Sequence, residues 1–197
     1  MIYLFDIQYD VSTAGPGLRT EVFLAGCSKA KSHPCPGCFN PKLWDKKNSR
    51  QVTVDDLLNH IVKYSSKKKV TFCGGEPTDQ LEELTEICRK LKAKDKEFNI
   101  LVYTYHDFDK LIDKPEYKEL FRYIDYLIDR PYDETKRIYD NQSDLWIKRS
   151  IGSYNQRIIK FSALNGCNDR YVDTFDIHEC GRISLYSITP DRIIEYP

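Results

Sequence analysis

The sequence predicts an α/β fold with a mostly parallel sheet, and two observations support this. Short apolar runs rich in β-branched and aromatic residues alternate with helical segments of about 10–15 residues, as in βαβ units. At 41% hydrophobic residues, the 197-residue chain can bury a substantial core. Because no internal repeat or low-complexity linker divides it, and its length suits one domain, we expect a single domain over residues 1–197.

The amino-terminal part opens with two strands and a long loop. Residues 2–5 and 20–25 are short apolar runs and predict strands. Residues 27–50 are rich in Cys, Pro, Gly, Lys and Asn and show no helical period, which is typical of a long functional loop. Thr53 is a good N-cap, so we expect a helix to begin there, with carboxylates in its first turn.

The middle of the chain continues the alternation. The pattern predicts a helix from Gln80, and a second helix over about 107–122 that is interrupted near Pro115. After Asp129 the alternation fades, and residues 130–156 are interpreted as an irregular connection. The further predicted strands are residues 70–73, 100–103, 126–129, 157–161, 183–188 and 193–196.

Charge and hydropathy exclude several classes of function. Basic and acidic residues both number 30, and this balance argues against a nucleic-acid or membrane-surface binder, which needs an excess of positive charge. No apolar stretch approaches the length of a membrane span. The first residues lack the charged start and long apolar run of a signal peptide. We therefore expect a cytoplasmic protein.

Three of the seven cysteines are packed into the predicted loop. Cys27, Cys35 and Cys38 stand as C-x7-C-x2-C, and clustered cysteines without an export signal indicate metal or redox chemistry. An iron–sulfur cluster with one open iron fits three thiolates. A zinc site completed by His33 fits equally well on spacing alone. We interpret Cys73 and Cys88 as core thiols, and we assign no role to Cys167 and Cys180.

The two glycines after the strand at residues 70–73 lie in a similar place to Cys27. Gly74 and Gly75 directly follow one predicted strand, and Cys27 directly follows another. Parallel sheets bind ligands at the carboxyl ends of their strands. We therefore predict that the two motifs form one site.

The surroundings of the cysteines resemble a known family. The motifs are GPGLRT at 15–20, FLAGC at 23–27, CPGCFNP at 35–41, WD at 44–45 and CGGEP at 73–77. Together they resemble the radical S-adenosylmethionine enzymes, specifically the activases of glycyl-radical enzymes. Residues 152–157, GSYNQR, resemble an element of the activases of anaerobic ribonucleotide reductase. The resemblance covers about 15–160, which leaves about 161–197 as a C-terminal extension.

The resemblance implies a cofactor site and a fold. It implies that Cys27, Cys35 and Cys38 bind a [4Fe–4S] cluster whose open iron is chelated by S-adenosylmethionine. The fold that we expect is an incomplete parallel (β/α)6-type barrel of about six strands.

Further residues are implied around the cofactor. Gly74, Gly75 and Glu76 would receive the methionine ammonium on their backbone, where glycine permits close approach. Gly37 and Phe39 would flank the adenine, and Asp129 would touch the ribose or methionine part. The resemblance assigns no catalytic residue beyond these ligands.

The implied activity is reductive cleavage of S-adenosylmethionine to a 5′-deoxyadenosyl radical, which makes a glycyl radical on a protein partner. The expected partner is anaerobic ribonucleoside-triphosphate reductase, with flavodoxin or ferredoxin as electron donor. The family's usual spacing is C-x3-C-x2-C, so the longer first gap and the extension favour one alternative, and the three cysteines with His33 leave a second one open. One is a radical enzyme that acts on another glycyl-radical enzyme or a peptide. The other is a non-catalytic zinc module.

Overall fold

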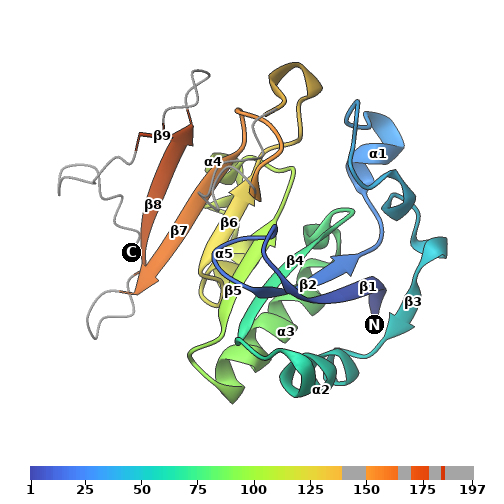
Figure 1. Ribbon diagram of the computed structural model, residues 1–197, viewed down its shortest axis with the longest axis vertical. Coiled ribbons are helices and arrows are strands. Elements are labelled where there is room, and N and C mark those ends of the chain that lie inside the picture. Colours follow the sequence, from blue (N-terminus) through green and yellow to red (C-terminus); the bar gives the residue numbers. More distant parts are fainter. Residues whose placement is uncertain (139–149, 164–169, 178–182, 185–197) are drawn as a thin grey trace.

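The computed structural model describes residues 1–138, 150–163, 170–177 and 183–184 (Figure 1). These residues form one nine-stranded mixed sheet in the order β3-β1-β2-β4-β5-β6-β7-β8-β9. The strands are β1 (Ile2–Val11), β2 (Arg19–Leu24), β3 (Arg50–Val52), β4 (Lys69–Gly74), β5 (Asn99–Tyr103), β6 (Tyr126–Asp129), β7 (Arg157–Ala163), β8 (Arg170–Ile177) and β9 (Ile183–Ser184). The helices are α1 (Ser28–Ser32), α2 (Val54–Tyr64), α3 (Leu81–Lys94), α4 (Phe108–Leu111) and α5 (Pro115–Phe121). Four short 3₁₀ helices are η1 (Pro41–Leu43), η2 (Lys46–Asn48), η3 (Pro77–Gln80) and η4 (Glu134–Lys136).

The predicted α/β class and partial barrel are confirmed, with a difference in strand direction. Strands β2, β4, β5 and β6 are parallel, whereas β1 pairs antiparallel with β2 and β7 pairs antiparallel with β6. The parallel part therefore has four strands rather than about six. For β1 the reason is local, because the short connection to β2 cannot carry the crossover that a parallel pair needs.

Two predicted helix features appear as the sequence indicates. Thr53 caps α2, and its Oγ1 accepts a hydrogen bond from the Asp56 N–H at 3.0 Å. The predicted helix over 107–122 is interrupted, because α4 ends before Pro115 and α5 begins with that proline. Proline suits the first turn of a helix, where its missing N–H costs no hydrogen bond.

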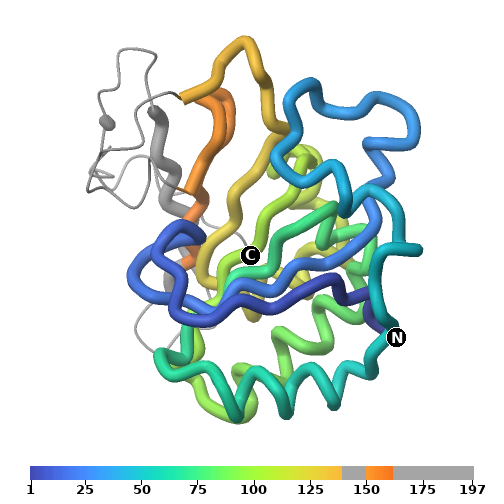
Figure 2. The backbone as a smooth tube through the Cα atoms, turned by 45° about the vertical axis from the view of Figure 1, so that its right-hand side comes forward, coloured from blue at the N-terminus to red at the C-terminus, as the bar shows by residue number. Residues whose placement is uncertain are grey.

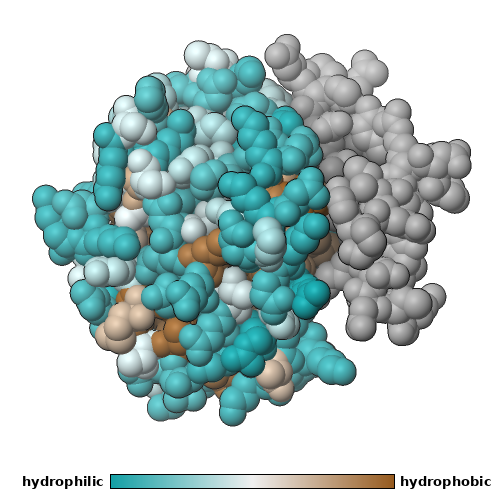
Figure 3. Space-filling view, turned by 180° about the vertical axis from the view of Figure 1, so that it is seen from behind, coloured by the Kyte–Doolittle hydropathy of each residue, from teal (hydrophilic) through white to brown (hydrophobic). Residues whose placement is uncertain are grey.

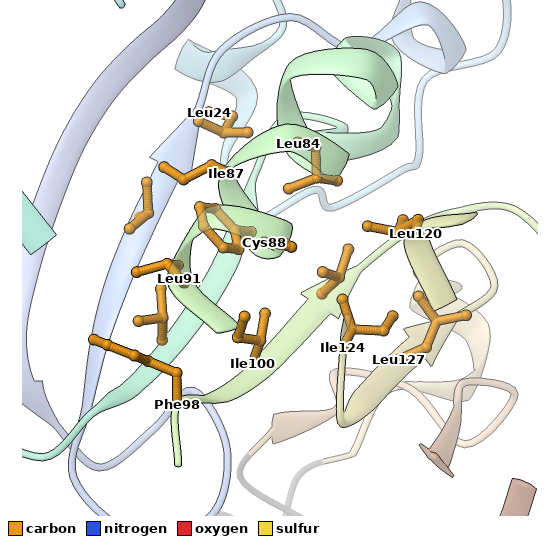
Figure 4. Close-up of a cluster of buried hydrophobic side chains, with 14 of the residues drawn as sticks. Leu24, Leu84, Ile87, Cys88, Leu91, Phe98, Ile100, Leu120, Ile124 and Leu127 are labelled. Carbon is orange, nitrogen blue, oxygen red and sulfur yellow. The ribbon is translucent and has the colours of Figure 1, made fainter. Parts of the chain in front are cut away.

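The main core lies between the sheet and its helices. Leu84, Ile87 and Leu91 of α3 are completely buried and pack toward Ile100 of β5 and Leu127 of β6 (Figure 4). Their spacing along α3 is that of one helical face. Cys88 lies in the same cluster, as expected for a core thiol.

A smaller cluster occupies the opposite face of the sheet. It contains Leu101 of β5, Ile128 of β6 and Ile158 of β7, together with Ile138 and Ile151. Successive side chains of a strand point to opposite faces. On the face of the sheet that carries this small cluster, side chains of β2, β4 and β5 line a cavity, which is described below.

Arg19 is buried at the amino ends of the parallel strands and not at the site. It donates to Thr71 Oγ1 and Asn99 Oδ1, both at 2.7 Å, and to the carbonyl oxygens of Val70 and Asn99. These bonds tie β2 to β4 and β5. All four of these partners are uncharged.

The loops that carry the sequence motifs gather at one end of the molecule. Figure 2 shows the segment after β2 and the segment after β6 at the same end, beyond the carboxyl ends of the strands. The rear face is mostly hydrophilic, with small separate hydrophobic patches (Figure 3). No helix in the described ranges has the length and apolar character needed to cross a bilayer. The predicted strand at 193–196, Cys167 and Cys180 lie outside the described residues.

Candidate functional site

A cavity of about 560 Å³ opens at the carboxyl ends of the parallel strands. Phe23 of β2, Cys73 of β4 and Tyr103 of β5 form part of its wall. The three clustered cysteines and residues 74–76 line the same cavity. The structure thus brings together the two motifs that the sequence placed at one edge of the sheet.

The three cysteine side chains are partly exposed toward this cavity. Cys27 follows β2 and precedes α1, whereas Cys35 and Cys38 share a turn in which the Cys38 N–H donates to the Cys35 carbonyl. Burial raises the pKa of Cys27 to about 11 and also raises the pKa of Cys35. A metal centre that deprotonates these thiols would therefore have to compensate for their burial.

Cys38 has hydrogen-bond donors aimed at its sulfur. The Asn40 N–H and the Trp44 Nε1–H each lie 3.4 Å from Sγ. Such donors stabilise a thiolate and orient it, as the outer partners of metal ligands generally do. The chemistry around Cys38 therefore fits a metal-bound thiolate.

Three cysteines line the cavity, and three thiolates suit an iron–sulfur cluster with one open iron, because each thiolate binds a different iron. A zinc site would need His33 as its fourth ligand. His33 is exposed and lies outside the lining of this cavity. The residues that line the cavity therefore fit a cluster better than the predicted zinc site.

Gly74 and Gly75 are packed against backbone. Gly74 has φ +115°, and a Cβ on it would contact the Leu24 carbonyl oxygen; a Cβ on Gly75 would contact the Gly26 carbonyl oxygen. The Gly75 and Glu76 N–H groups donate to those two carbonyl oxygens at 2.8 and 2.7 Å. The glycines therefore hold the end of β4 against the start of the cysteine loop. This is a second reason for glycine, beside the cofactor approach that the sequence suggested.

Glu76 is buried at the cavity wall, with its carboxylate bound on both sides. One oxygen accepts from the Thr78 N–H and hydroxyl at 3.0 and 2.6 Å, and the other accepts from the Tyr105 N–H at 2.8 Å. Burial raises the pKa of Glu76 to about 7, although the donors from Thr78, Tyr105 and Thr104 act to lower it. The side chain thereby links the loop after β4 to the loop after β5.

Phe39 and Gly37 take different places. Phe39 is 60% exposed, lines the cavity and packs on Tyr132 with ring centroids 4.8 Å apart. Gly37 has φ +69°, and a Cβ there would contact the Glu134 carboxylate. Gly37 thus allows the turn between the cysteines to lie against the segment after β6, and Phe39 forms the aromatic wall.

Asp129 does not line the cavity. Its carboxylate is completely buried and accepts hydrogen bonds from Arg157, at 2.6 and 3.2 Å, and from the Phe108 N–H at 2.9 Å. The resemblance implied that Asp129 touches the ribose or methionine part of the cofactor. The orientation of the side chain, toward Arg157 and Phe108, does not favour that contact. Ile128 faces the small inner cluster, so its neighbour Asp129 points to the other face.

The GSYNQR element closes one side of the cavity. Gln156 accepts from the Gly152 N–H at 2.8 Å and donates to the Arg130 carbonyl at 3.2 Å. Asn155 donates to the Pro131 carbonyl at 2.8 Å. The element therefore holds the segment after β6 in place, with Gly152 and Gln156 at the cavity wall.

Sequence reasoning did not assign Trp44, Tyr105 and Tyr132 to the site, yet all three line the cavity. A signal existed for two of them. Trp44 belongs to the motif that follows Cys38, and Tyr105 follows β5 even more closely than Cys27 follows β2. Tyr132 lies in a segment whose irregular pattern carries no such signal.

Known proteins resemble this chain over most of its described length. Residues 13–159 match the family described as a 4Fe-4S single cluster domain. The chain is 28% identical to the anaerobic ribonucleoside-triphosphate reductase-activating protein of Pasteurella multocida, over 75% of this chain and 90% of that protein. It is 36% identical to the pyruvate formate-lyase-activating enzyme of Staphylococcus epidermidis, over 46% of this chain. That match spans only 37% of the Staphylococcus enzyme, and a match to the Clostridium pasteurianum enzyme spans 34% of it.

Proposed function

This chain belongs to the 4Fe-4S single cluster domain family and to the radical S-adenosylmethionine activases within it, and from that premise we propose that it generates a glycyl radical on a protein partner. The observation that carries the proposal is the single cavity shared by Cys27, Cys35, Cys38 and residues 74–76. When bound, a reduced [4Fe–4S] cluster supplies the electron that cleaves S-adenosylmethionine to methionine and the 5′-deoxyadenosyl radical, which takes a hydrogen atom from a glycine Cα.

The protein's own residues bind, orient and shield. The three thiolates would hold the cluster, with Trp44 and the Asn40 N–H orienting Cys38. The backbone of residues 74–76 would receive the methionine ammonium, while Phe39 offers an aromatic surface to the adenine. Phe39 and Tyr132 pack together at the cavity wall and form one aromatic surface there.

We propose anaerobic ribonucleoside-triphosphate reductase as the partner. The Pasteurella multocida relative supports this choice because the match spans nearly all of that protein. The pyruvate formate-lyase-activating relatives favour a second candidate, another glycyl-radical enzyme, although the chain matches little more than a third of each. The seven-residue gap between Cys27 and Cys35 is compatible with either partner.

Anaerobic reconstitution followed by cofactor turnover tests the function. The loaded protein should contain about four irons and four sulfides per chain. With dithionite it should convert S-adenosylmethionine to 5′-deoxyadenosine and methionine. Alanine at Cys27, Cys35 or Cys38 should abolish loading and turnover, whereas the matched variant Cys88→Ala should load normally because Cys88 lies in the core. Stoichiometric zinc without iron, or loaded protein that yields no 5′-deoxyadenosine, would contradict the proposal.

A further inference from the structure

We propose that Glu21 binds a positively charged side chain on the glycine-bearing loop of the partner protein, and so helps to select that partner. This rests on the proposed function, which requires such a loop to enter the cavity. Glu21 lies on β2 and lines the cavity together with Cys73 of β4 and Tyr103 of β5. It falls between the GPGLRT and FLAGC motifs, and the family resemblance assigns it no role.

Glu21 lies farther along the sheet than the cysteines and the two glycines. Leu24 of β2 pairs with Gly74, and Glu21, three residues earlier, pairs with Thr71. At about 3.3 Å per residue, Glu21 is roughly 10 Å from the level of Gly74, toward the amino ends of the strands. The cavity therefore extends beyond the residues proposed for S-adenosylmethionine, and Glu21 belongs to the part that a second molecule would occupy.

The carboxylate of Glu21 has one weak hydrogen-bond partner within the described ranges. The Cys73 thiol donates to Oε1 at 3.3 Å, and a thiol is a weak donor. Burial raises the pKa of Glu21, although this bond acts to lower it. In the same cavity wall, Glu76 accepts three shorter hydrogen bonds. Glu21 is therefore the less well satisfied carboxylate, and a cation that reached it would relieve the cost of its burial.

Two neighbouring polar groups bond elsewhere. Tyr103 lies on the adjacent part of the cavity wall, but its hydroxyl donates to the Ser150 carbonyl oxygen. Arg19 lies two residues before Glu21 on β2, but its guanidinium binds the uncharged partners at the amino ends of the strands. Neither group neutralises the Glu21 carboxylate.

The cations among the described cavity residues also have other partners, and none forms an ion pair with Glu21. Two pair with carboxylates and one lies over an aromatic ring: Arg130 with Asp107 at 3.5 Å, Arg137 with Glu134 at 3.2 Å, and Lys29 over Tyr105 at 5.8 Å from the ring centroid. A cation for Glu21 is therefore expected from a molecule that enters the cavity.

A charge pair at this place would discriminate between partners. A loop with a basic side chain completes the pair, whereas a loop without one leaves the carboxylate buried and unpaired. Such a penalty contributes more to specificity than to affinity. No bond is made or broken at Glu21, so its role is to determine specificity and not to catalyse the reaction.

Peptide binding tests the charge pair without any turnover. Two labelled, capped peptides carry a single glycine among alanine and serine; one has arginine on both sides of the glycine, and the other has glutamine there. Each is titrated anaerobically with the reconstituted protein, and fluorescence anisotropy is measured. The wild type should bind the arginine peptide at least about tenfold more tightly, and Glu21→Gln should reduce this preference to within about twofold. The matched exposed variant Glu82→Gln should keep the preference of the wild type.

A second readout separates the partner from S-adenosylmethionine. With dithionite and no partner, Glu21→Gln should bind and cleave S-adenosylmethionine within about twofold of the wild type, while the KM for the reductase in glycyl-radical formation should rise at least about tenfold. Failure of the wild type to cleave S-adenosylmethionine with dithionite would refute the proposed function, whereas the peptide series would still report on Glu21.

Unfolding and charge reversal distinguish this role from a structural one. Glu21→Gln keeps the shape of the side chain and removes its charge, so urea unfolding should show no loss of stability. Glu21→Lys should prefer a peptide with glutamate in place of arginine; if this variant does not fold, Glu21→Gln decides. Equal binding of the arginine and glutamine peptides to the wild type, an unchanged preference in Glu21→Gln, or about tenfold weaker binding of S-adenosylmethionine by Glu21→Gln would overturn the proposal.

Discussion

Among single residues, Arg157 joins three elements of the fold beside the cavity. Its guanidinium contacts Asp129 at 2.6 Å, Asp107 at 2.9 Å and Asp109 at 3.1 Å. Asp129 is completely buried, and its charge is stable there only because Arg157 and the Phe108 N–H satisfy it. The residue thereby ties the start of β7 to the end of β6 and to α4.

Arg157→Met should destabilise the fold strongly. The change leaves the Asp129 carboxylate buried without its cation, a loss that typically costs about 3–5 kcal/mol. Urea unfolding of the variant and the wild type measures this difference. The matched control is Arg122→Met, whose exposed ion pair with Glu119 should contribute less than about 1 kcal/mol. Similar losses of unfolding free energy in the two variants would show that the buried ion pair contributes no more stability than the exposed one.

Among the elements, β4 and β5 are connected at the site through one carboxylate. Glu76 follows β4 and accepts the N–H of Tyr105, which follows β5. Its pKa of about 7 in the folded protein lies above its ordinary value of 4.5, chiefly because of burial. Folding therefore favours the protonated form of Glu76, and stability must depend on pH.

The free energy of unfolding should decrease as the pH rises from about 4.5 to about 7, and this group should add no further change above that. An acid with a raised pKa in the folded state contributes up to about 3 kcal/mol at low pH and loses it as the pH passes the folded pKa. Urea unfolding at several pH values between about 5 and 8 should show this slope. Burial lowers the pKa of His106, which adds an opposite slope, so a variant must isolate Glu76.

Glu76→Gln provides that comparison because its amide does not titrate. The difference in the free energy of unfolding between the wild type and Glu76→Gln should vary with pH between about 5 and 8. The matched exposed variant Glu82→Gln should keep the pH dependence of the wild type. A pH-independent difference for Glu76→Gln would mean that the carboxylate is ionised in the folded protein throughout the range.

The elements that sequence reasoning predicted are those with local causes. Thr53 caps α2 through a hydrogen bond to a residue three positions away. Pro115 interrupts the helix through its own backbone geometry, whatever the tertiary contacts of that helix are. The places of Arg19 and Asp129 depend instead on residues far along the chain. Arg19 bonds to Thr71 and Asn99, and Asp129 bonds to Arg157, through strand neighbours that no local pattern reveals.

For Asp129 a local signal was nevertheless present. Ile128 is apolar and faces the inner cluster, so the alternation of a strand already directs Asp129 to the other face. Reasoning from the end of the strand alone missed this alternation. In contrast, Gly74 ends β4 and Cys27 follows the end of β2, and both line the cavity, as the rule about strand ends predicts.

The molecule as a whole gathers its sequence motifs at one end of the sheet. The cavity opens among the loops that follow β2, β4, β5 and β6, at the carboxyl ends of the parallel strands. The function proposed above requires that a loop of a partner protein enter this space.

The choice of protein partner also concerns the whole molecule, because it is argued from how much of each relative the chain covers. The match to the Pasteurella multocida protein covers 90% of that protein, whereas the match to the Staphylococcus epidermidis enzyme covers 37% of that enzyme. We therefore expect the loaded protein, with reductant and S-adenosylmethionine, to produce a glycyl-radical doublet in the electron paramagnetic resonance spectrum of anaerobic ribonucleoside-triphosphate reductase. Replacing the target glycine of the reductase by alanine should abolish the doublet. A doublet on pyruvate formate-lyase but none on the reductase would instead select the second candidate.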